Sequence, residues 1–280
     1  MPIRTYYWAQ RNVSLYKYYK YKFREPNRFV FKKGNAGDIF NIDLIKFLYQ
    51  DKPINIKDEG RRLLLVGSII NKIQYGDLIC GIGWKGNDLN SKSKIIESLE
   101  VHGVRGPLTR SLFEKHGNDL SKLKFEYDPG LLLKEVYNLN LKKSSNSQIT
   151  FIPHFQDINI YKGKYPKNIK FINIDNTPKN IAKEILKSEI VYASSLHGII
   201  FSHALNKPCV FVKPQTNEPL FKYRDYYLSV GLELPDGLKS IESVNVRKDK
   251  PTILNKSIGL DDFHFPDIQS LKNKNIITNV

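Results

Sequence analysis

Short apolar segments alternate with amphipathic ones along most of this chain, and this alternation limits the fold more than any other feature of the sequence. Leu63–Ile70 and Asp77–Trp84 are apolar enough to be strands buried on both faces of a sheet. Residues 39–50 carry apolar side chains at helical spacing, and residues 177–188 open with a Thr-Pro helix start. Strands that alternate with helices form parallel sheets with crossover helices, so the sequence predicts an α/β fold.

A polar segment divides this pattern in two. Residues 138–148 are rich in Asn, Ser and Lys and lack periodicity, which is typical of a linker. We therefore expect an N-terminal lobe over residues 1–140 and a C-terminal lobe over residues 148–235. Residues 236–280 are Lys-rich and weakly patterned, and they either pack back on the lobes or remain loose. Residues 16–29 interleave Tyr with Lys and predict an edge strand or arm, or a contact with a glycan or membrane surface.

The charge of the chain indicates an anionic partner. The 280 residues include 44 Lys and Arg against 28 Asp and Glu, a net charge of +16. Such a bias suits nucleic acid, a phosphorylated small molecule or an acidic lipid surface, and does not choose among them. We expect no nucleic-acid partner, because no motif of that class is present.

Cys80 and Cys209 lie in apolar runs and are expected to be buried free thiols. With no signal peptide or membrane-spanning run in the sequence, we expect a cytoplasmic protein.

Two glycine-bearing loops stand where a strand is expected to run into a helix, the place where open α/β sheets bind ligands. The first is Gly34-Asn35-Ala36-Gly37-Asp38, whose backbone N–H groups can approach an anion closely and whose Asp38 is a candidate N-cap. The second contains Arg105, a guanidinium that can grip a carboxylate or phosphate bidentately. An ordinary glycine turn and a surface ion pair would explain these two loops equally well.

The segment from Ser194 to Gly198 carries the strongest functional signal. It joins a clear strand to a clear helix, with Ser195 as the natural N-cap and His197 in the first turn. The helix dipole should lower the pKa of His197, so that a neutral imidazole is available for proton transfer. Lys213 ends the next strand and should return to the same edge, where it could neutralise an anionic ligand or simply be solvated.

Other site classes are not indicated. No Cys/His cluster has metal-ligand spacing, so no metal is expected. The phosphate-binding loop of nucleotide hydrolases and the full dinucleotide fingerprint are both missing, so no cofactor is expected.

At this point an ordered set of motifs resembles a known family. GNAGD (residues 34–38), GVRGPLT (103–109), YDPGLLL (127–133), FIPHFQD (151–157), SSLHGIIFSHALNKP (194–208) and FVKP (211–214) are similar to the polysaccharide pyruvyltransferases. The resemblance runs from about Gly34 to Gly231, and the Ser-Ser-Leu-His-Gly segment is its most specific part. One departure is that the family's Gly-Asp-Pro turn reads Tyr127-Asp128-Pro129 here.

The resemblance implies two Rossmann-like lobes around a cleft, as in GT-B glycosyltransferases. It implies a transferase that uses phosphoenolpyruvate as co-substrate and leaves a pyruvate ketal on a sugar of an exopolysaccharide, capsule or other cell-envelope glycan. Its catalytic residues would map onto His197, Arg105 and Asp38. Donor-binding residues would include Ser194, Ser195, Leu196 and Lys213, with Gly34, Asn35 and Gly37 in the glycine loop.

From these residues we expect His197 to be the general acid/base, Arg105 to clamp the donor with help from Lys213, and Asp38 to orient an acceptor hydroxyl. A lipid-linked acceptor would bring the protein to the inner face of an anionic membrane. The alternative enzyme is a GT-B-type glycosyltransferase that uses a nucleotide sugar. The alternative from another class is a non-catalytic protein that binds polyanions and has no use for His197.

Overall fold

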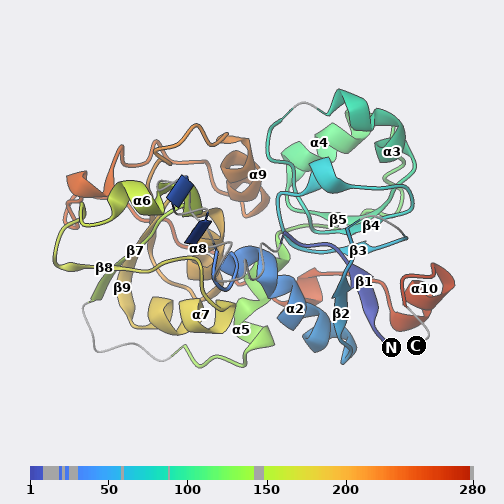
Figure 1. The fold of residues 1–280 in the computed structure, drawn as a ribbon, viewed down its shortest axis with the longest axis horizontal. Coiled ribbons are helices and arrows are strands. Elements are labelled where there is room, and N and C mark those ends of the chain that lie inside the picture. Colours follow the sequence, from blue (N-terminus) through green and yellow to red (C-terminus); the bar gives the residue numbers. More distant parts are fainter. Residues whose placement is uncertain are drawn as a thin grey trace.

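The computed structural model describes residues 1–8, 19–20, 23–24, 31–57, 60–87, 89–141 and 148–277. Within these residues the strands form a six-stranded sheet, of order β2-β1-β3-β4-β5-β6, and a four-stranded sheet, of order β10-β9-β7-β8. Every strand pair within the two sheets is parallel. Figure 1 shows the two sheets side by side, each with its own helices. The predicted α/β fold with two Rossmann-like, GT-B-like lobes is confirmed.

The six-stranded sheet is built from the N-terminal half of the chain. Its strands are β1 (Ile3–Thr5), β2 (Pro53–Asn55), β3 (Leu63–Leu64), β4 (Leu78–Cys80), β5 (Glu100–Val104) and β6 (Phe125–Glu126). The strand expected over Leu63–Ile70 is wrong beyond Leu64, because Gly67 adopts a φ of +131° and turns the chain out of the sheet. The edge strand or arm expected over residues 16–29 falls largely outside the described residues.

The four-stranded sheet follows the polar segment. Its strands are β7 (Gln148–Ile152), β8 (Ile169–Phe171), β9 (Ser188–Ala193) and β10 (Cys209–Phe211). The α-helices of the described residues are α2 (Ala36–Tyr49), α3 (Ser93–Glu97), α4 (Pro107–Lys115), α5 (Leu133–Val136), α6 (Ile158–Tyr161), α7 (Pro178–Leu186), α8 (Leu196–Ala204), α9 (Phe221–Ser229) and α10 (Ile268–Asn273). The 3-10 helices are η1 (Ile70–Lys72), η2 (Asn90–Lys92), η3 (Pro129–Leu132), η4 (Phe155–Asp157), η5 (Ile241–Ser243) and η6 (Leu260–Asp262).

Two helices form the centre of the molecule between the sheets. Residues Leu196 to His203 of α8 are buried, because the helix is covered by the second sheet on one side and by η3 and α2 on the other. Helix α2 packs against α7 of the second lobe, and Phe40 of α2 meets the ring of Phe201 of α8 at 5.6 Å between centroids. One hydrophobic core therefore continues from one sheet to the other.

The C-terminal segment crosses both lobes. Thr252 exchanges backbone hydrogen bonds with Cys209 of β10, and farther along Ile276 accepts a hydrogen bond from the Arg4 N–H beside β1. Figure 1 shows the N-terminus and α10 beside the first sheet. Cys80 and Cys209 are buried free thiols, as predicted. Among the described helices, none has the length and apolarity required to span a bilayer.

Candidate active site

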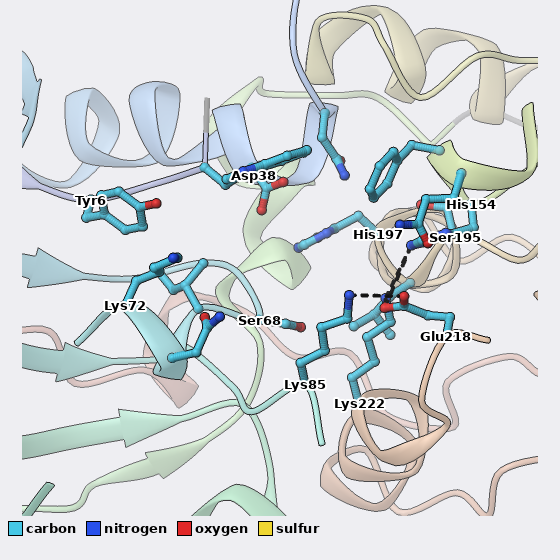
Figure 2. A pocket seen from close by; sticks show the side chains of 17 residues that line it. Tyr6, Asp38, Ser68, Lys72, Lys85, His154, Ser195, His197, Glu218 and Lys222 are labelled. Carbon is cyan, nitrogen blue, oxygen red and sulfur yellow. Dashed lines mark hydrogen bonds and ion pairs between the residues drawn. The ribbon is translucent and has the colours of Figure 1, made fainter. Parts of the chain in front are cut away.

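A cavity of about 330 Å³ opens between the two lobes, and acidic, basic and aromatic side chains surround it. Side chains from loops that follow strands of both sheets and from α2, α8 and α9 line it (Figure 2). The lining residues are Tyr6, Trp8, Asn35, Asp38, Ser68, Ile69, Asn71, Lys72, Lys85, His154, Phe155, Gln156, Ser195, Leu196, His197, Glu218 and Lys222. Five of the predicted site residues thus line one cavity: Asn35, Asp38, Ser195, Leu196 and His197.

The N-terminus of α8 forms one wall of the cavity. Strand β9 ends at Ala193, and Ser195 caps the helix by accepting a hydrogen bond from the Gly198 N–H at 3.3 Å. His197 follows in the first turn and points its ring into the cavity (Figure 2). Its Nε2 lies 4.0 Å from Oδ1 of Asp128 and has no hydrogen-bond partner among the described residues. This nitrogen is itself buried and faces Asp128, at a distance longer than a hydrogen bond.

Ser194 acts behind this wall. Its hydroxyl accepts a hydrogen bond from the His154 N–H at 2.8 Å, so it fixes the end of β7 rather than lining the cavity. The two serines before the helix thus have different tasks, one capping α8 and the other placing His154.

The glycine loop meets α8 directly. Any side chain at position 37 would collide with the ring of His197, so only glycine allows α2 to approach this closely. The backbone N–H of Gly34 donates to the carboxylate of Asp175 in the second lobe at 2.9 Å, and that carboxylate also accepts from two neighbouring backbone groups. The N-cap of α2 is Asn35, which accepts from the Gly37 N–H, so the expectation that Asp38 caps this helix is wrong.

Asp38 instead stands in the first turn of α2 with its carboxyl group directed into the cavity (Figure 2). Burial raises its pKa to about 7, against the opposing charge of Lys222. Asp128, in the Tyr-Asp-Pro turn, is buried behind His197, and burial raises its pKa to about 6 although the charge of Arg105 opposes the shift. Near neutral pH these two carboxyl groups can therefore each exist with or without a proton.

His197 and His154 are both neutral near pH 7. The pKa of His197 falls to about 3, chiefly because of burial and then because of the positive charges of Arg105 and Lys222. Burial and Lys222 likewise lower the pKa of His154 to about 3. The predicted direction of the His197 shift is confirmed, but its main cause is burial rather than the helix dipole.

Arg105 lies beneath the cavity and does not line it. Its guanidinium is fully buried, donates to Asp225 of α9 at 3.1 Å and to the Trp84 carbonyl at 2.5 Å, and reaches the cavity by a 2.6 Å hydrogen bond to Ser68. Gly83 provides the space for the guanidinium, because a side chain there would overlap it. Arg105 is therefore one step removed from any bound molecule in this arrangement.

Lys213 also lies away from the cavity, and other basic residues take the place predicted for it. Lys222 of α9 and Lys85, which follows β4, both line the cavity and contact Glu218. Sequence reasoning missed these three residues and His154. The signals that the sequence offered were the place of His154 in the FIPHFQD motif and the i, i+4 spacing of Glu218 and Lys222, a common pairing on helices.

Among the described residues, no group of three or more His, Cys, Asp or Glu side chains is arranged to hold a metal ion. The chemistry that the site offers is instead that of two neutral imidazoles, two carboxyl groups of raised pKa and several cations around one cavity.

Comparison with known proteins gives a consistent result. Residues 15–216 match the polysaccharide pyruvyl transferase family. An uncharacterised protein of Acanthamoeba polyphaga mimivirus is 26% identical over 251 residues, which cover 85% of this chain and 82% of that protein. The succinoglycan biosynthesis protein ExoV of Rhizobium meliloti is 24% identical over 212 residues, which cover 71% of this chain and 62% of ExoV. No solved structure matches the chain.

The family match spans well over half of the chain and contains the glycine loop, Arg105, Asp128 and the Ser-Ser-Leu-His-Gly segment. It therefore includes both walls of the cavity that bring Asp38 and His197 together. This chain belongs to the polysaccharide pyruvyl transferase family.

Proposed function

We propose that this protein transfers pyruvate from phosphoenolpyruvate to two hydroxyl groups of one sugar, as a ketal, and releases phosphate. The acceptor is a cell-surface polysaccharide, such as an exopolysaccharide or capsule, or its lipid-linked precursor. The observation that carries the proposal is the neutral His197 in a cavity that also holds a carboxyl group of raised pKa and several cations. Such a set suits an anionic donor that must gain and lose protons.

The reaction requires three proton movements and one leaving group. A proton adds to the methylene carbon of the donor, and a sugar hydroxyl attacks the neighbouring carbon while giving its own proton to a base. The bond from that carbon to the phosphate oxygen then breaks, and phosphate leaves with the electron pair. A second hydroxyl of the same sugar closes the ketal, and its proton leaves with the phosphate.

Asp38 and His197 share these steps in our proposal. Asp38 holds a proton near neutral pH and can supply it, because burial raises its pKa to about 7. His197 starts neutral and can accept the hydroxyl proton. A bound donor brings negative charge, which offsets the positive charges near His197 and raises its pKa, so that the ring can keep the proton and later return it. The N-terminus of α8 offers its backbone N–H groups to the donor.

The acceptor sugar has an aromatic surface available in the same cavity. Trp8 and Phe155 both line it, with their ring centroids 5.5 Å apart, and Tyr6 lines it as well. The apolar face of a pyranose ring packs on such side chains, which bury large area at low entropic cost. We propose that the sugar stacks there and presents its hydroxyl pair to Asp38 and His197.

Phosphate release from phosphoenolpyruvate, with and without a panel of synthetic or lipid-linked glycosides, tests the proposal. We expect release that depends on an acceptor and falls by roughly 100-fold or more in His197→Ala, the usual contribution of general acid–base catalysis. His264→Ala, which changes an exposed histidine of the C-terminal segment, serves as the matched control and should retain activity.

Failure would have a distinct signature. No release with any acceptor, together with thermal protection by a nucleotide sugar and none by phosphoenolpyruvate, would contradict the proposal and favour a glycosyltransferase. Release that survives in His197→Ala would remove that residue from the mechanism.

A further inference from the structure

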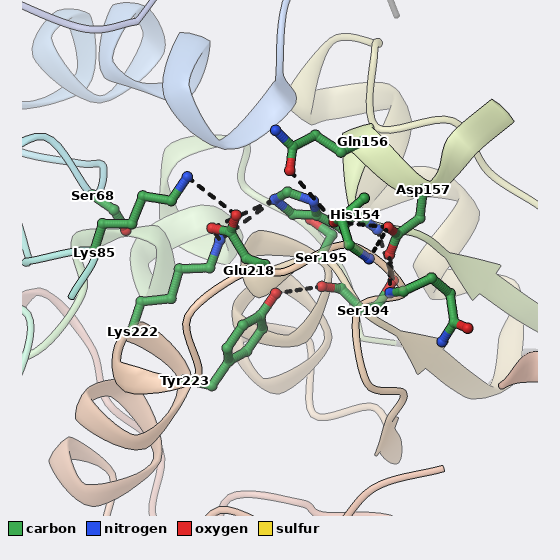
Figure 3. A network of polar contacts seen from close by, with 12 residues as sticks. Ser68, Lys85, His154, Gln156, Asp157, Ser194, Ser195, Glu218, Lys222 and Tyr223 are labelled. Carbon is green, nitrogen blue, oxygen red and sulfur yellow. Dashed lines mark hydrogen bonds and ion pairs between the residues drawn. The ribbon is translucent and has the colours of Figure 1, made fainter. Parts of the chain in front are cut away.

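One carboxylate in the wall of the cavity contacts three basic groups. Oε1 of Glu218 lies 2.5 Å from Nζ of Lys222 and 3.8 Å from Nε2 of His154, and Oε2 lies 3.1 Å from Nζ of Lys85 (Figure 3). The side chains of Glu218 and Lys222 are buried, whereas that of Lys85 is 34% exposed. Glu218 thus sits between two ammonium groups at the edge of the open space.

This cluster carries more positive than negative charge. Lys85 and Lys222 contribute two positive charges, Glu218 contributes one negative charge, and His154 is neutral near pH 7. Burial tends to raise the pKa of Glu218, but the charge of Lys222, its hydrogen bond to the carboxylate and the charge of Lys85 outweigh burial and lower the pKa. The carboxylate is therefore ionised near neutral pH, and one positive charge of the cluster remains uncompensated.

The two lysines are held in place from different lobes. The residue before Lys85, Trp84, packs its ring on Phe221 of α9 at 4.6 Å and has its carbonyl bound by Arg105. Lys222 follows Phe221 in the same helix. Because Trp84 and Phe221 pack together, the backbone at Lys85 and at Lys222 is held close from both lobes, whether or not Glu218 lies between the two side chains.

We propose that Lys85 and Lys222 form the subsite for the phosphate of the donor, and that Glu218 is an internal counter-ion that the phosphate displaces. A phosphate group, with one or two negative charges depending on pH and with several oxygen atoms, can bridge two ammonium groups more fully than a carboxylate can. Buried ion pairs add little to net stability, so stability alone does not explain the pairing of Glu218 with Lys222. A carboxylate that another anion can displace explains it better. The inference rests on the proposed function for the identity of the donor.

Binding of inorganic phosphate, without any acceptor, tests the subsite by titration calorimetry at pH 6. Lys85→Met should weaken phosphate binding about tenfold, roughly the loss of one charge-assisted hydrogen bond. Lys274→Met is the matched control, because Lys274 also pairs with a glutamate at partial exposure but lies outside the cavity, and it should bind phosphate as the unchanged protein does.

The decisive variant is Glu218→Gln, which keeps the shape and removes the competing charge. We expect it to bind inorganic phosphate more tightly, by about tenfold, whereas a purely structural Glu218 would leave binding unchanged or weaken it. The measurement uses pH 6, below the pKa of about 8 to which burial lowers Lys222, so that this lysine is protonated at the start. Phosphoenolpyruvate should follow the same order of affinities.

Two results would overturn the inference: Glu218→Gln that binds phosphate no more tightly, or Lys85→Met that binds it as well as the Lys274→Met control. Acceptor-dependent phosphate release by the unchanged protein alongside either result would leave the proposed function standing and remove only the subsite. The predicted order of phosphate affinities without any pyruvyl transfer would instead keep the subsite and remove the function.

Discussion

Burial moves the pKa of the Asp38 carboxyl group far from its ordinary value. Its carboxyl group is nearly inaccessible in the first turn of α2, and burial raises its pKa to about 7. An unfolded chain loses this proton near pH 4. The folded protein therefore binds more protons than the unfolded chain between about pH 4 and pH 7, and its free energy of unfolding must fall as the pH rises through that window.

Replacement of Asp38 by Asn removes this penalty. Below about pH 4 both proteins carry a neutral group and should be similarly stable. At pH 8 Asp38→Asn should be the more stable protein, by at most about 4 kcal/mol at 1.4 kcal/mol per pKa unit, while its transferase activity falls. Urea unfolding at several pH values measures the difference, and Asp261→Asn, at an exposed position, is the control. A stability difference that does not grow with pH would show that Asp38 ionises normally.

The position of His197 could be predicted from sequence because it depends on local structure. A strand, two serines and a helix start place its side chain at the carboxyl edge of a parallel sheet. The role of Glu218 could not be predicted in this way. Its partners are Lys222 on the same stretch of chain and Lys85 more than a hundred residues earlier, and only the packing of two lobes brings the three together.

Helix α9 joins the two lobes beneath the cavity. Asp225 is fully buried, and its carboxylate accepts hydrogen bonds from Arg105 and from both the N–H and the hydroxyl of Thr109 in α4. Gly106 lets α9 approach, because a side chain there would meet the Asp225 backbone. The helix therefore places Lys222 and Glu218 in the cavity and holds the N-terminal lobe against them.

A buried ion pair holds α9 against the N-terminal lobe, so removing one partner of the pair should lower the free energy of unfolding strongly. Asp225→Asn leaves the Arg105 charge buried without its partner, and we expect the free energy of unfolding to fall by about 3–5 kcal/mol. Glu114→Gln breaks the exposed Arg110–Glu114 pair and should cost less than about 0.5 kcal/mol. Chemical denaturation of both variants measures these values. A similar small cost for both would mean that α9 is not held by this pair.

The sequence did not predict α9 because its pattern lacks the usual signal. Residues 221–229 mix aromatic and charged side chains without one apolar face, since Lys222 and Asp225 are buried for polar contacts while Tyr223, Tyr226 and Tyr227 are buried in the core. Helix α7, with a capped start and one buried face, was recognised for the opposite reason. A helix that buries charged side chains lacks a single apolar face, so hydrophobic periodicity does not predict it.

The whole molecule carries a charge of +16, far more than the cluster in the cavity uses. The remaining lysines would draw the protein to an anionic surface, where a lipid-linked acceptor would be found. We propose that the protein works in the cytoplasm, at the inner face of the membrane.

Vesicle sedimentation tests this proposal. We expect binding to vesicles that contain an anionic phospholipid, loss of binding as salt rises toward roughly 1 M, where the screening length is about 3 Å, and little binding to neutral phosphatidylcholine vesicles. Equal binding to both kinds of vesicle, or binding insensitive to salt, would contradict an electrostatic contact.

The central claim is that a proton from the enzyme adds to the donor methylene before the ketal forms. The reaction of phosphoenolpyruvate with an accepted glycoside in heavy water, followed by NMR of the product, tests it directly. We predict a pyruvate ketal on the sugar whose methyl group carries one deuterium. A modified sugar without that deuterium, or a glycoside that gains a different group, would contradict the account.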